Sequence, residues 1–358
     1  MRDIVHGRAL HQEPTDMREI RGETRWPGWM GFVVVCVSLL VTLVAAEGLF
    51  LLARYMVKGG PQSEVAEIVD DPELGWALNP NRKQLVRTNS CGETITRDPP
   101  PSRYLAKVPT HPEGTRVLFL GDSFTHAHEV STGAAYYDVF ERETSGRYAV
   151  FAAGSGGYGT AQEFLLLKRL TSEIAPQIVI WQLSTNDVAE NVFAGADPST
   201  VQRIRPYLEP ASGAFRSADP SLWLFKHSEL AKFAYSRLAG LDRAHSLGLL
   251  AALNRVLASH AKPPQEVERE GLEVLSRLVD NAKRMLPGVR IVGFIADREF
   301  DDKYAAVFRA RQLEYWPGVA AAVAAQPERT DCKPLDGHWN SAGNVAAGRI
   351  LAQRLVER

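Results

Sequence analysis

The stretch Arg116-Val-Leu-Phe-Leu-Gly-Asp-Ser-Phe-Thr125 decides the fold class of this chain. Its residues from Val117 to Leu120 form an unbroken apolar run that ends at a glycine, which predicts a buried strand of a parallel sheet. Ligands of such sheets bind at the carboxyl ends of the strands, so this strand delivers Ser123 to the binding edge. A serine there acts as a nucleophile only if other segments supply a base, an orienting group and oxyanion donors.

Segments after this strand alternate between predicted strands and predicted helices. Further strands are expected over 148–153, 177–183 and 289–295, and helices over 134–144, 160–174, 266–286, 300–313 and 340–356. Strands that alternate with helices of this length imply right-handed crossovers and a parallel sheet that is covered on both faces. We therefore predict an α/β fold with three layers, α/β/α, over residues 116–358.

The alternation breaks down between residues 191 and 262. Within this insertion, Leu222 to His260 is amphipathic, which predicts helix. The insertion is either a lid that shapes the substrate pocket or a segment that completes the core, and the sequence favours neither interpretation.

The beginning of the chain predicts a membrane anchor. A polar tail, residues 1–28, contains five arginines, and about 21 residues without a charge follow from Trp26 to Ala46. Such a run crosses a hydrocarbon core of about 30 Å, so we assign residues 29–56 to one transmembrane helix. A buried core helix is rarely apolar on all faces over this length, and a cleaved signal peptide lacks so long a polar segment ahead of its apolar run.

Arginines ahead of the apolar run outnumber the basic residues close behind it. The positive-inside tendency then places the N-terminus in the cytoplasm and the catalytic domain outside it, as a single-pass membrane protein. Residues 57–115 are rich in proline, glycine and polar residues, which predicts an extended connector that packs on the surface of the following domain.

Composition argues against several classes of protein. The net charge is −1 with acids and bases interspersed, so no basic stripe indicates a nucleic-acid partner. The three cysteines, Cys36, Cys91 and Cys332, have no CxxC spacing, which argues against a structural zinc site. No feature predicts an obligate protein partner or a cofactor.

Two polar or glycine-rich segments follow predicted strands. Ala153-Gly-Ser-Gly-Gly-Tyr-Gly-Thr160 contains Gly157, and glycines let the backbone approach a ligand and turn amide groups toward it. Its spacing differs from the dinucleotide pattern GxGxxG. Leu183-Ser-Thr-Asn-Asp187 places Asn186 where a side-chain amide can donate to a developing oxyanion. Alone, each segment is equally typical of a turn or a helix cap.

A third segment, Asp336-Gly-His-Trp-Asn-Ser-Ala-Gly343, comes directly before the last predicted helix. Asp336 and His338 are two residues apart, so in an extended chain they point to the same side. The carboxylate can then hold the imidazole in one tautomer while the other ring nitrogen faces a serine. A surface turn with a helix cap is the simpler interpretation of this segment taken by itself.

The ordered set of motifs, Gly121-Asp122-Ser123, the glycine-rich turn, Asn186-Asp187 and the Asp336/His338 pair, resembles the SGNH branch of the GDSL esterase/lipase family. The resemblance covers roughly residues 116–356 and implies a flavodoxin-like sheet and a serine esterase. It implies that Ser123 is the nucleophile and His338 the general base, oriented by Asp336. The backbone amides of Ser123 and Gly157 and the side chain of Asn186 would form the oxyanion hole.

This sequence departs from the family pattern at two positions. Ser184 stands where the family usually has glycine, and only Gly337 separates the acid from the histidine where the family usually has two residues. The short spacing is similar to that of polysaccharide-modifying acetyltransferase relatives and of other membrane-tethered members.

The expected activity is therefore a hydrolase acting on ester bonds of a small-molecule, glycan or lipid substrate, tethered to the membrane. One alternative is an O-acetyltransferase that acts on cell-envelope or exported polysaccharide. A second alternative is a catalytically inactive envelope protein that binds carbohydrate or serves as a scaffold.

Two smaller features remain open. His126 and His128, followed by Glu129, are spaced poorly for a metal and show no third ligand, so we expect no metal site and interpret both as histidines of the surface or pocket rim.

Cys91 and Cys332 form a disulfide between the connector and the loop of the catalytic histidine if the domain is exported, and remain thiols in a reducing compartment.

Overall fold

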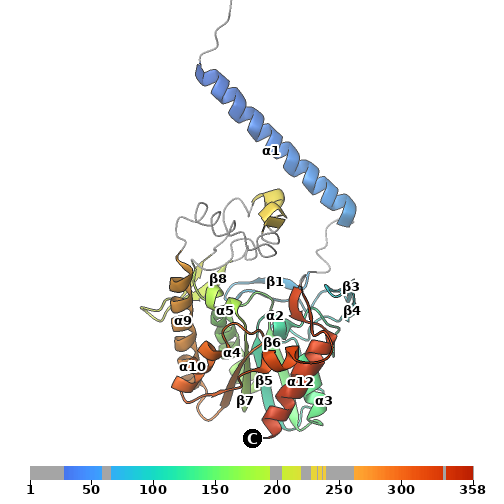
Figure 1. The fold of residues 1–358 in the computed structure, drawn as a ribbon, viewed down its shortest axis with the longest axis vertical. Coiled ribbons are helices and arrows are strands. Elements are labelled where there is room, and N and C mark those ends of the chain that lie inside the picture. Colours follow the sequence, from blue (N-terminus) through green and yellow to red (C-terminus); the bar gives the residue numbers. More distant parts are fainter. Residues whose placement is uncertain are drawn as a thin grey trace, which may run out of the picture.

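A five-stranded parallel sheet forms the centre of the domain (Figure 1). The computed structural model describes residues 28–58, 66–193, 204–218, 227–231, 233–235, 237–238, 262–333 and 336–357. Its central strands lie in the order β11-β10-β7-β5-β6. They are β5 (Thr115–Gly121), β6 (Tyr148–Gly154), β7 (Ile178–Leu183), β10 (Arg290–Ile295) and β11 (Glu314–Tyr315).

Strand β5 carries the apolar run on which the fold class rests. Val117, Leu118, Phe119 and Leu120 are all fully buried, because the strand has a neighbour on each side and helices on both faces. Taken in chain order, the strands follow the flavodoxin-like arrangement 2-1-3-4-5. The order reverses at β5, so the crevice at its carboxyl end is where ligands of such sheets bind.

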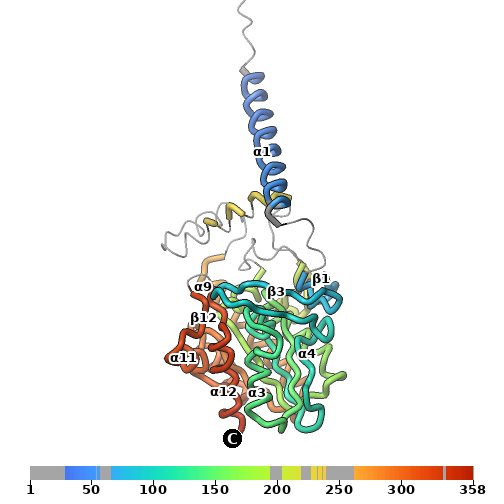
Figure 2. Tube along the Cα trace, turned by 90° about the vertical axis from the view of Figure 1, so that its right-hand side faces the viewer, coloured from blue at the N-terminus to red at the C-terminus, as the bar shows by residue number. Residues whose placement is uncertain are grey.

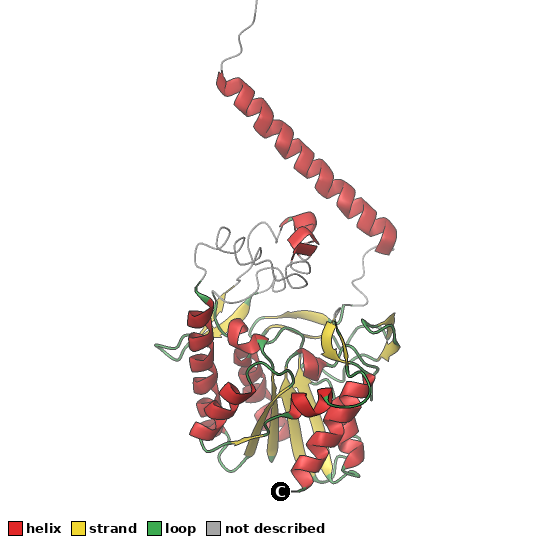
Figure 3. Cartoon of the chain, in the orientation of Figure 1, coloured by secondary structure: helices red, strands yellow, loops and turns green. Residues whose placement is uncertain are grey.

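Helices cover both faces of the sheet and confirm the predicted three-layer fold (Figures 1 and 3). The helices on one face are α4 (Thr160–Ile174), α9 (Pro264–Met285) and α10 (Asp301–Ala310). Those on the other face are α3 (Tyr136–Glu143), α11 (Val319–Ala324) and α12 (Ser341–Val356). Two short helices, α2 (Ser123–His126) and α5 (Asn186–Glu190), follow the carboxyl ends of β5 and β7.

The connector contains more regular structure than the expected extended chain. It forms two antiparallel hairpins, β1 (Ile68–Asp71) with β2 (Gly75–Leu78) and β3 (Leu85–Thr88) with β4 (Thr94–Arg97). Figure 2 shows both hairpins across the end of the domain nearest α1. Leu74 and Trp76 are buried in the same core as α4, so the connector contributes to the core as well as covering the surface.

The N-terminal helix α1 (Gly28–Lys58) stands apart from the domain and exposes most of its apolar side chains (Figure 1). Among the described helices it alone is long and apolar enough to cross a membrane, over Trp29–Ala53. This length and composition suit a membrane span or a signal sequence.

Part of the insertion contacts the end of α1. It contributes one described hairpin, β8 (Arg205–Leu208) with β9 (Phe215–Ala218), while most of the predicted helix 222–260 lies outside the described residues. Glu47 accepts hydrogen bonds from the Ser228 hydroxyl (2.6 Å) and from the backbone N–H groups of Glu229 (2.8 Å) and Leu230 (3.2 Å). The rings of Phe50 and Phe233 lie 5.2 Å apart. The one carboxylate within the apolar run is therefore satisfied by polar groups of the insertion.

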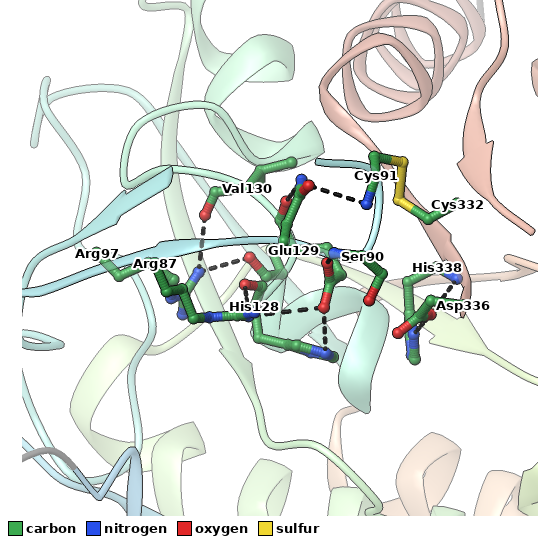
Figure 4. Close-up of polar contacts among 12 residues, drawn as sticks. Arg87, Ser90, Cys91, Arg97, His128, Glu129, Val130, Cys332, Asp336 and His338 are labelled. Atoms are coloured by element: carbon green, nitrogen blue, oxygen red, sulfur yellow. Dashed lines mark hydrogen bonds and ion pairs between the residues drawn. A yellow bond between two sulfur atoms is a disulfide. The ribbon is translucent and has the colours of Figure 1, made fainter. Parts of the chain in front are cut away.

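A small antiparallel sheet at the periphery carries the predicted acid and base. It pairs β12 (Asp331–Cys332) with β13 (Asp336–Trp339). Cys332 forms a disulfide with Cys91, which lies between β3 and β4 (Figure 4). The structure thus contains the disulfide that the sequence left open, and it joins the connector to the segment before His338.

Candidate active site

The turn that carries Ser123 is held by a network beneath it. Asp122 is fully buried and accepts hydrogen bonds from the Phe124 N–H (3.1 Å), the Gln182 side-chain amide (3.0 Å) and the Ser184 hydroxyl (2.7 Å). Gly121 lies so close to β7 that an added Cβ would stand 2.2 Å from the Gln182 side-chain oxygen. This close packing holds Ser123 at the N-terminus of α2, directly beyond the end of β5.

Ser123, His338 and Asp336 form a continuous hydrogen-bonded chain. His338 Nε2 lies 2.7 Å from Ser123 Oγ, and His338 Nδ1 lies 2.5 Å from Asp336 Oδ1. A ring proton on Nδ1, facing the carboxylate, leaves Nε2 as an acceptor for the serine hydroxyl. The structure therefore brings together the three side chains that the resemblance implies for nucleophile, base and orienting acid.

The short Asp-Gly-His spacing has a specific geometric result. Asp336 Oδ1 accepts the backbone N–H of His338 (2.8 Å) as well as its ring Nδ1, so one oxygen fixes both the chain and the imidazole. Although burial opposes it, hydrogen bonding to His338 lowers the pKa of Asp336 to about 2. Burial also opposes the shift of His338, but the hydrogen bond and charge of Asp336 raise its pKa above the ordinary value. The pair therefore favours a charged aspartate beside a basic histidine.

The glycine-rich turn is clamped by two residues distant in sequence. Gly157 has φ +79°, a left-handed conformation that favours glycine. Trp76 Nε1 donates to the Gly156 carbonyl (3.1 Å), and the Arg205 guanidinium donates to the Gly157 carbonyl (2.5 Å). Arg205 is itself fully buried and paired with Glu190. Both carbonyls are thus occupied by protein donors, and the turn is held in one conformation.

Asn186 opens α5 and lies in the wall of a cavity beside the base. Its Oδ1 is 2.7 Å from Ser184 Oγ, the same hydroxyl that contacts Asp122. The family-atypical serine thus joins the Asn186 side chain to the network under the nucleophile. On the other side, the Thr185 N–H donates to Asp297 (2.8 Å), which fixes the start of α5.

An open cavity of about 490 Å³ adjoins these groups. It is lined by Asn186 and His338 together with several charged side chains. The charged lining residues are Asp297, Arg298, Glu299 and Lys333. A polar alcohol or acyl acceptor is better suited to such a wall than a long alkyl chain.

Buried acids lie below the nucleophile turn. Glu163 and Asp187 are almost completely inaccessible to solvent. Burial, together with neighbouring carboxylates, raises the pKa of each well above its ordinary value. Burial and the neighbouring carboxylates thus favour the uncharged form of both acids.

The two histidines after Ser123 lie in different environments. His126 is buried, accepts the Gly156 N–H at Nδ1 (3.3 Å), and has a pKa held well below 6.5 mainly by burial, so it is not a surface residue, although it lines a cavity. His128 is half-buried, and its ring centroid lies 4.9 Å from that of His338. The short helix α2 ends at His126, and the residue that follows it, Ala127, has a left-handed conformation, so the chain turns between the two histidines.

Sequence reasoning missed the residues that support the site from outside the matched motifs. These are Trp76 and Arg205 at the glycine-rich turn, and Arg87 and Ser90, which contact His128 and Glu129 (Figure 4). Nothing in the sequence of the connector indicates that Trp76 contacts the glycine-rich turn. A charged residue such as Arg205 gives no signal of burial in a single sequence, because arginine is usually exposed.

Comparison with known proteins places the chain among acyl hydrolases. Residues 119–349 match the sequence profile of the GDSL-like Lipase/Acylhydrolase family. A search of the curated proteins found no match.

Solved structures that resemble the chain are distant. A carbohydrate acetylesterase family member from Sinorhizobium meliloti is 12% identical, with 68% of this chain and 98% of that chain covered and a TM-score of 0.36. A lipase/acylhydrolase from Enterococcus faecalis is 13% identical, with coverages of 68% and 96% and a TM-score of 0.36. An acetyl xylan esterase from Butyrivibrio proteoclasticus is 12% identical, with coverages of 74% and 67% and a TM-score of 0.35.

Proposed function

Because this chain belongs to the GDSL-like lipase/acylhydrolase family, we propose that it is a serine-dependent hydrolase that cleaves ester bonds through an acyl-serine intermediate. The observation that carries the proposal is the chain of contacts from Ser123 through His338 to Asp336, at 2.7 Å and 2.5 Å. Nucleophile, base and orienting acid within hydrogen-bond distance are the geometric signature of covalent acyl transfer.

The reaction has two steps. His338 Nε2 takes the Ser123 proton as Oγ attacks the ester carbonyl, and it then gives that proton to the leaving alcohol. The oxyanion is stabilised by the backbone N–H groups of Ser123 and Gly157 and by the Asn186 side chain. Water then attacks the acyl-serine with His338 as base, which releases the acid and restores the serine.

We place the active domain outside the cytoplasm, tethered by α1 with the N-terminus inside. Two independent features support this orientation. The polar tail carries five arginines, which the positive-inside tendency keeps in the cytoplasm. The Cys91–Cys332 disulfide is typical of oxidising compartments. Labelling Ser212→Cys with a membrane-impermeant maleimide in intact cells tests the orientation, and protection of this exposed residue would contradict it.

A fluorophosphonate probe tests the nucleophile directly. The full chain in detergent is expected to be labelled once, at Ser123, and to hydrolyse short-chain aryl esters. Ser123→Ala should abolish both signals, whereas Ser341→Ala, at an exposed serine on α12, should retain them. Absence of labelling in the unmodified chain would contradict catalysis and favour the inactive binding or scaffold protein.

An O-acetyltransferase is the second candidate. The charged wall of the cavity beside Asn186 and His338 favours it, because a sugar hydroxyl can take the place of water in the second step. Acetyl release to water, compared with acetyl transfer to an added polysaccharide, distinguishes the two activities. Transfer that exceeds hydrolysis would replace the esterase assignment.

A further inference from the structure

We propose that His128, Asp336 and His338 form a binding site for a divalent transition-metal ion of the Zn²⁺ class, and that the bound ion inhibits acyl transfer. The inhibitory part rests on the proposed function, because two of the three ligands are the orienting acid and the base. The ion is an inhibitor here, and the reaction proceeds without it.

The three side chains lie close together in space, although His128 is far from Asp336 and His338 in the sequence. Each offers one ligand atom, and these atoms lie within 4.8 Å of one another. Tetrahedral zinc with ligands at about 2.1 Å separates its ligand atoms by about 3.4 Å, so small side-chain rotations bring the set to bonding distance. The tertiary structure thus supplies the partners that the His-x-His pair lacks in sequence.

The donor chemistry matches this class of ion. Two imidazole nitrogens and one carboxylate oxygen form a ligand set common in zinc sites, with the fourth position left to water. Hard cations such as Mg²⁺ prefer oxygen ligands and bind such a set weakly.

The carboxylate of Glu129 orients the His128 ring. His128 Nε2 lies 3.1 Å from Glu129 Oε1, which leaves Nδ1 as the free ring nitrogen. Glu129 is in turn fixed by the Ser90 N–H (3.0 Å) and by Arg87, whose Nη2 is 3.6 Å away, as Figure 4 shows. A carboxylate that holds the far nitrogen of a metal-binding histidine is the usual support of such a ligand.

The site is open to ions from solvent. The side chains of His128, His338 and Asp336 are 26%, 27% and 20% exposed, respectively. His126 does not belong to the group, because it is buried and its Nδ1 already accepts the Gly156 N–H.

Binding requires a change of tautomer at His338. The proton that Nδ1 shares with Asp336 moves through solvent to Nε2, and metal–nitrogen and metal–oxygen bonds form in its place. With a proton on Nε2, His338 cannot accept the Ser123 proton, so acyl transfer stops until the ion is removed. No group is oxidised or reduced.

The test measures zinc binding without relying on catalysis. Isothermal titration of the full-length Ser123→Ala chain in detergent with ZnCl₂ should show one site that MgCl₂ does not fill. In the Ser123→Ala chain, a second substitution of His128→Gln should weaken zinc binding at least tenfold. A second substitution of Glu129→Gln should weaken it by about 10- to 100-fold. His111→Gln, at an exposed histidine outside the group, is the matched control and should leave binding unchanged.

Kinetics of the chain with Ser123 intact then test the consequence. Zinc should inhibit ester hydrolysis, EDTA should restore it, and His128→Gln should raise the inhibitory concentration at least tenfold relative to its own zinc-free rate. Equal zinc binding with and without His128→Gln would overturn the site. Zinc binding that leaves hydrolysis unaffected would overturn the inhibition. Zinc binding to a chain that shows no esterase activity would leave the site intact while the proposed function fails.

Discussion

Ser123 stands just beyond the end of β5, a central strand that is buried from Val117 to Gly121, whereas His338 stands on β13, a strand of four residues in a two-stranded sheet at the periphery. Ser123 is held by the core through Asp122. His338 is held by Asp336 and by a segment that a disulfide ties to the connector. Substitutions near His338 should therefore reduce activity without reducing the stability of the core. Substitutions in the network beneath Ser123 should also reduce stability.

The largest effect on rate is expected for Asp336→Asn. An amide cannot stabilise the imidazolium and permits the wrong ring tautomer, so kcat should fall by up to about 10⁴-fold. The melting temperature should change little, because Asp336 lies on the peripheral sheet. Steady-state kinetics with an aryl ester and thermal unfolding of the same sample check this. A large loss of stability would show that the peripheral sheet that carries Asp336 contributes to the stability of the core.

Asn186→Ala should have the next largest effect. Removing one oxyanion donor from an acyl-transfer site costs about 100- to 1,000-fold in kcat. KM should stay nearly constant, because the lost interaction is made mainly in the transition state. Unchanged kcat would exclude Asn186 from the oxyanion hole.

Removing the disulfide, by Cys91→Ser together with Cys332→Ser, should reduce kcat by up to about 100-fold, the cost of misplacing a catalytic group by about 1 Å. The rate of fluorophosphonate labelling should fall in parallel, and near-native circular dichroism should show that the sheet persists. Cys36→Ser, in α1, is the matched control. Full activity of the double variant would show that Asp336 alone positions the base.

The acid limb of the pH–rate profile should lie above pH 6.5. The base must be neutral to accept a proton, and Asp336 raises the pKa of His338 above that value, so kcat/KM falls as the pH drops through the raised pKa. In Asp336→Asn the carboxylate that raises the pKa of His338 is gone, while the burial that lowers this pKa remains. The acid limb of the residual activity should therefore lie at lower pH. A limb at or below 6.5 in the unmodified enzyme would contradict the assignment of His338 as base.

The smallest effect on rate is expected for Ser184→Ala, and it should appear mainly in stability. The change removes one of the three donors to the buried Asp122 carboxylate, and a hydrogen bond to a charged group contributes about 1.5–3 kcal/mol. The free energy of unfolding should fall by about that amount, measured by denaturant titration in detergent. Ser341→Ala provides the surface control. If Ser184→Ala and Ser341→Ala were equally stable, the network beneath Ser123 would not contribute to stability, and its contrast with the peripheral sheet that carries His338 would be wrong.

Much of the central fold was predictable because local pattern and tertiary environment agree there. Residues 160–174 were predicted as helix and form α4 with the same bounds. β11 was missed because two residues carry no periodic signal. The connector hairpins were missed because their strands are four residues long and lie in a proline-rich stretch that resembles an open chain.

The sequence by itself determined the parallel sheet, its three layers and the order of the motifs, because buried strands and amphipathic helices have periods that can be read locally. Only the tertiary structure decided which side chains meet. It places His128 beside His338 and Asp336, Trp76 and Arg205 against the glycine-rich turn, and Cys91 on Cys332. Such contacts join residues far apart in the chain, and whether a single charged or aromatic residue points into a site or into solvent depends on packing that leaves no local pattern.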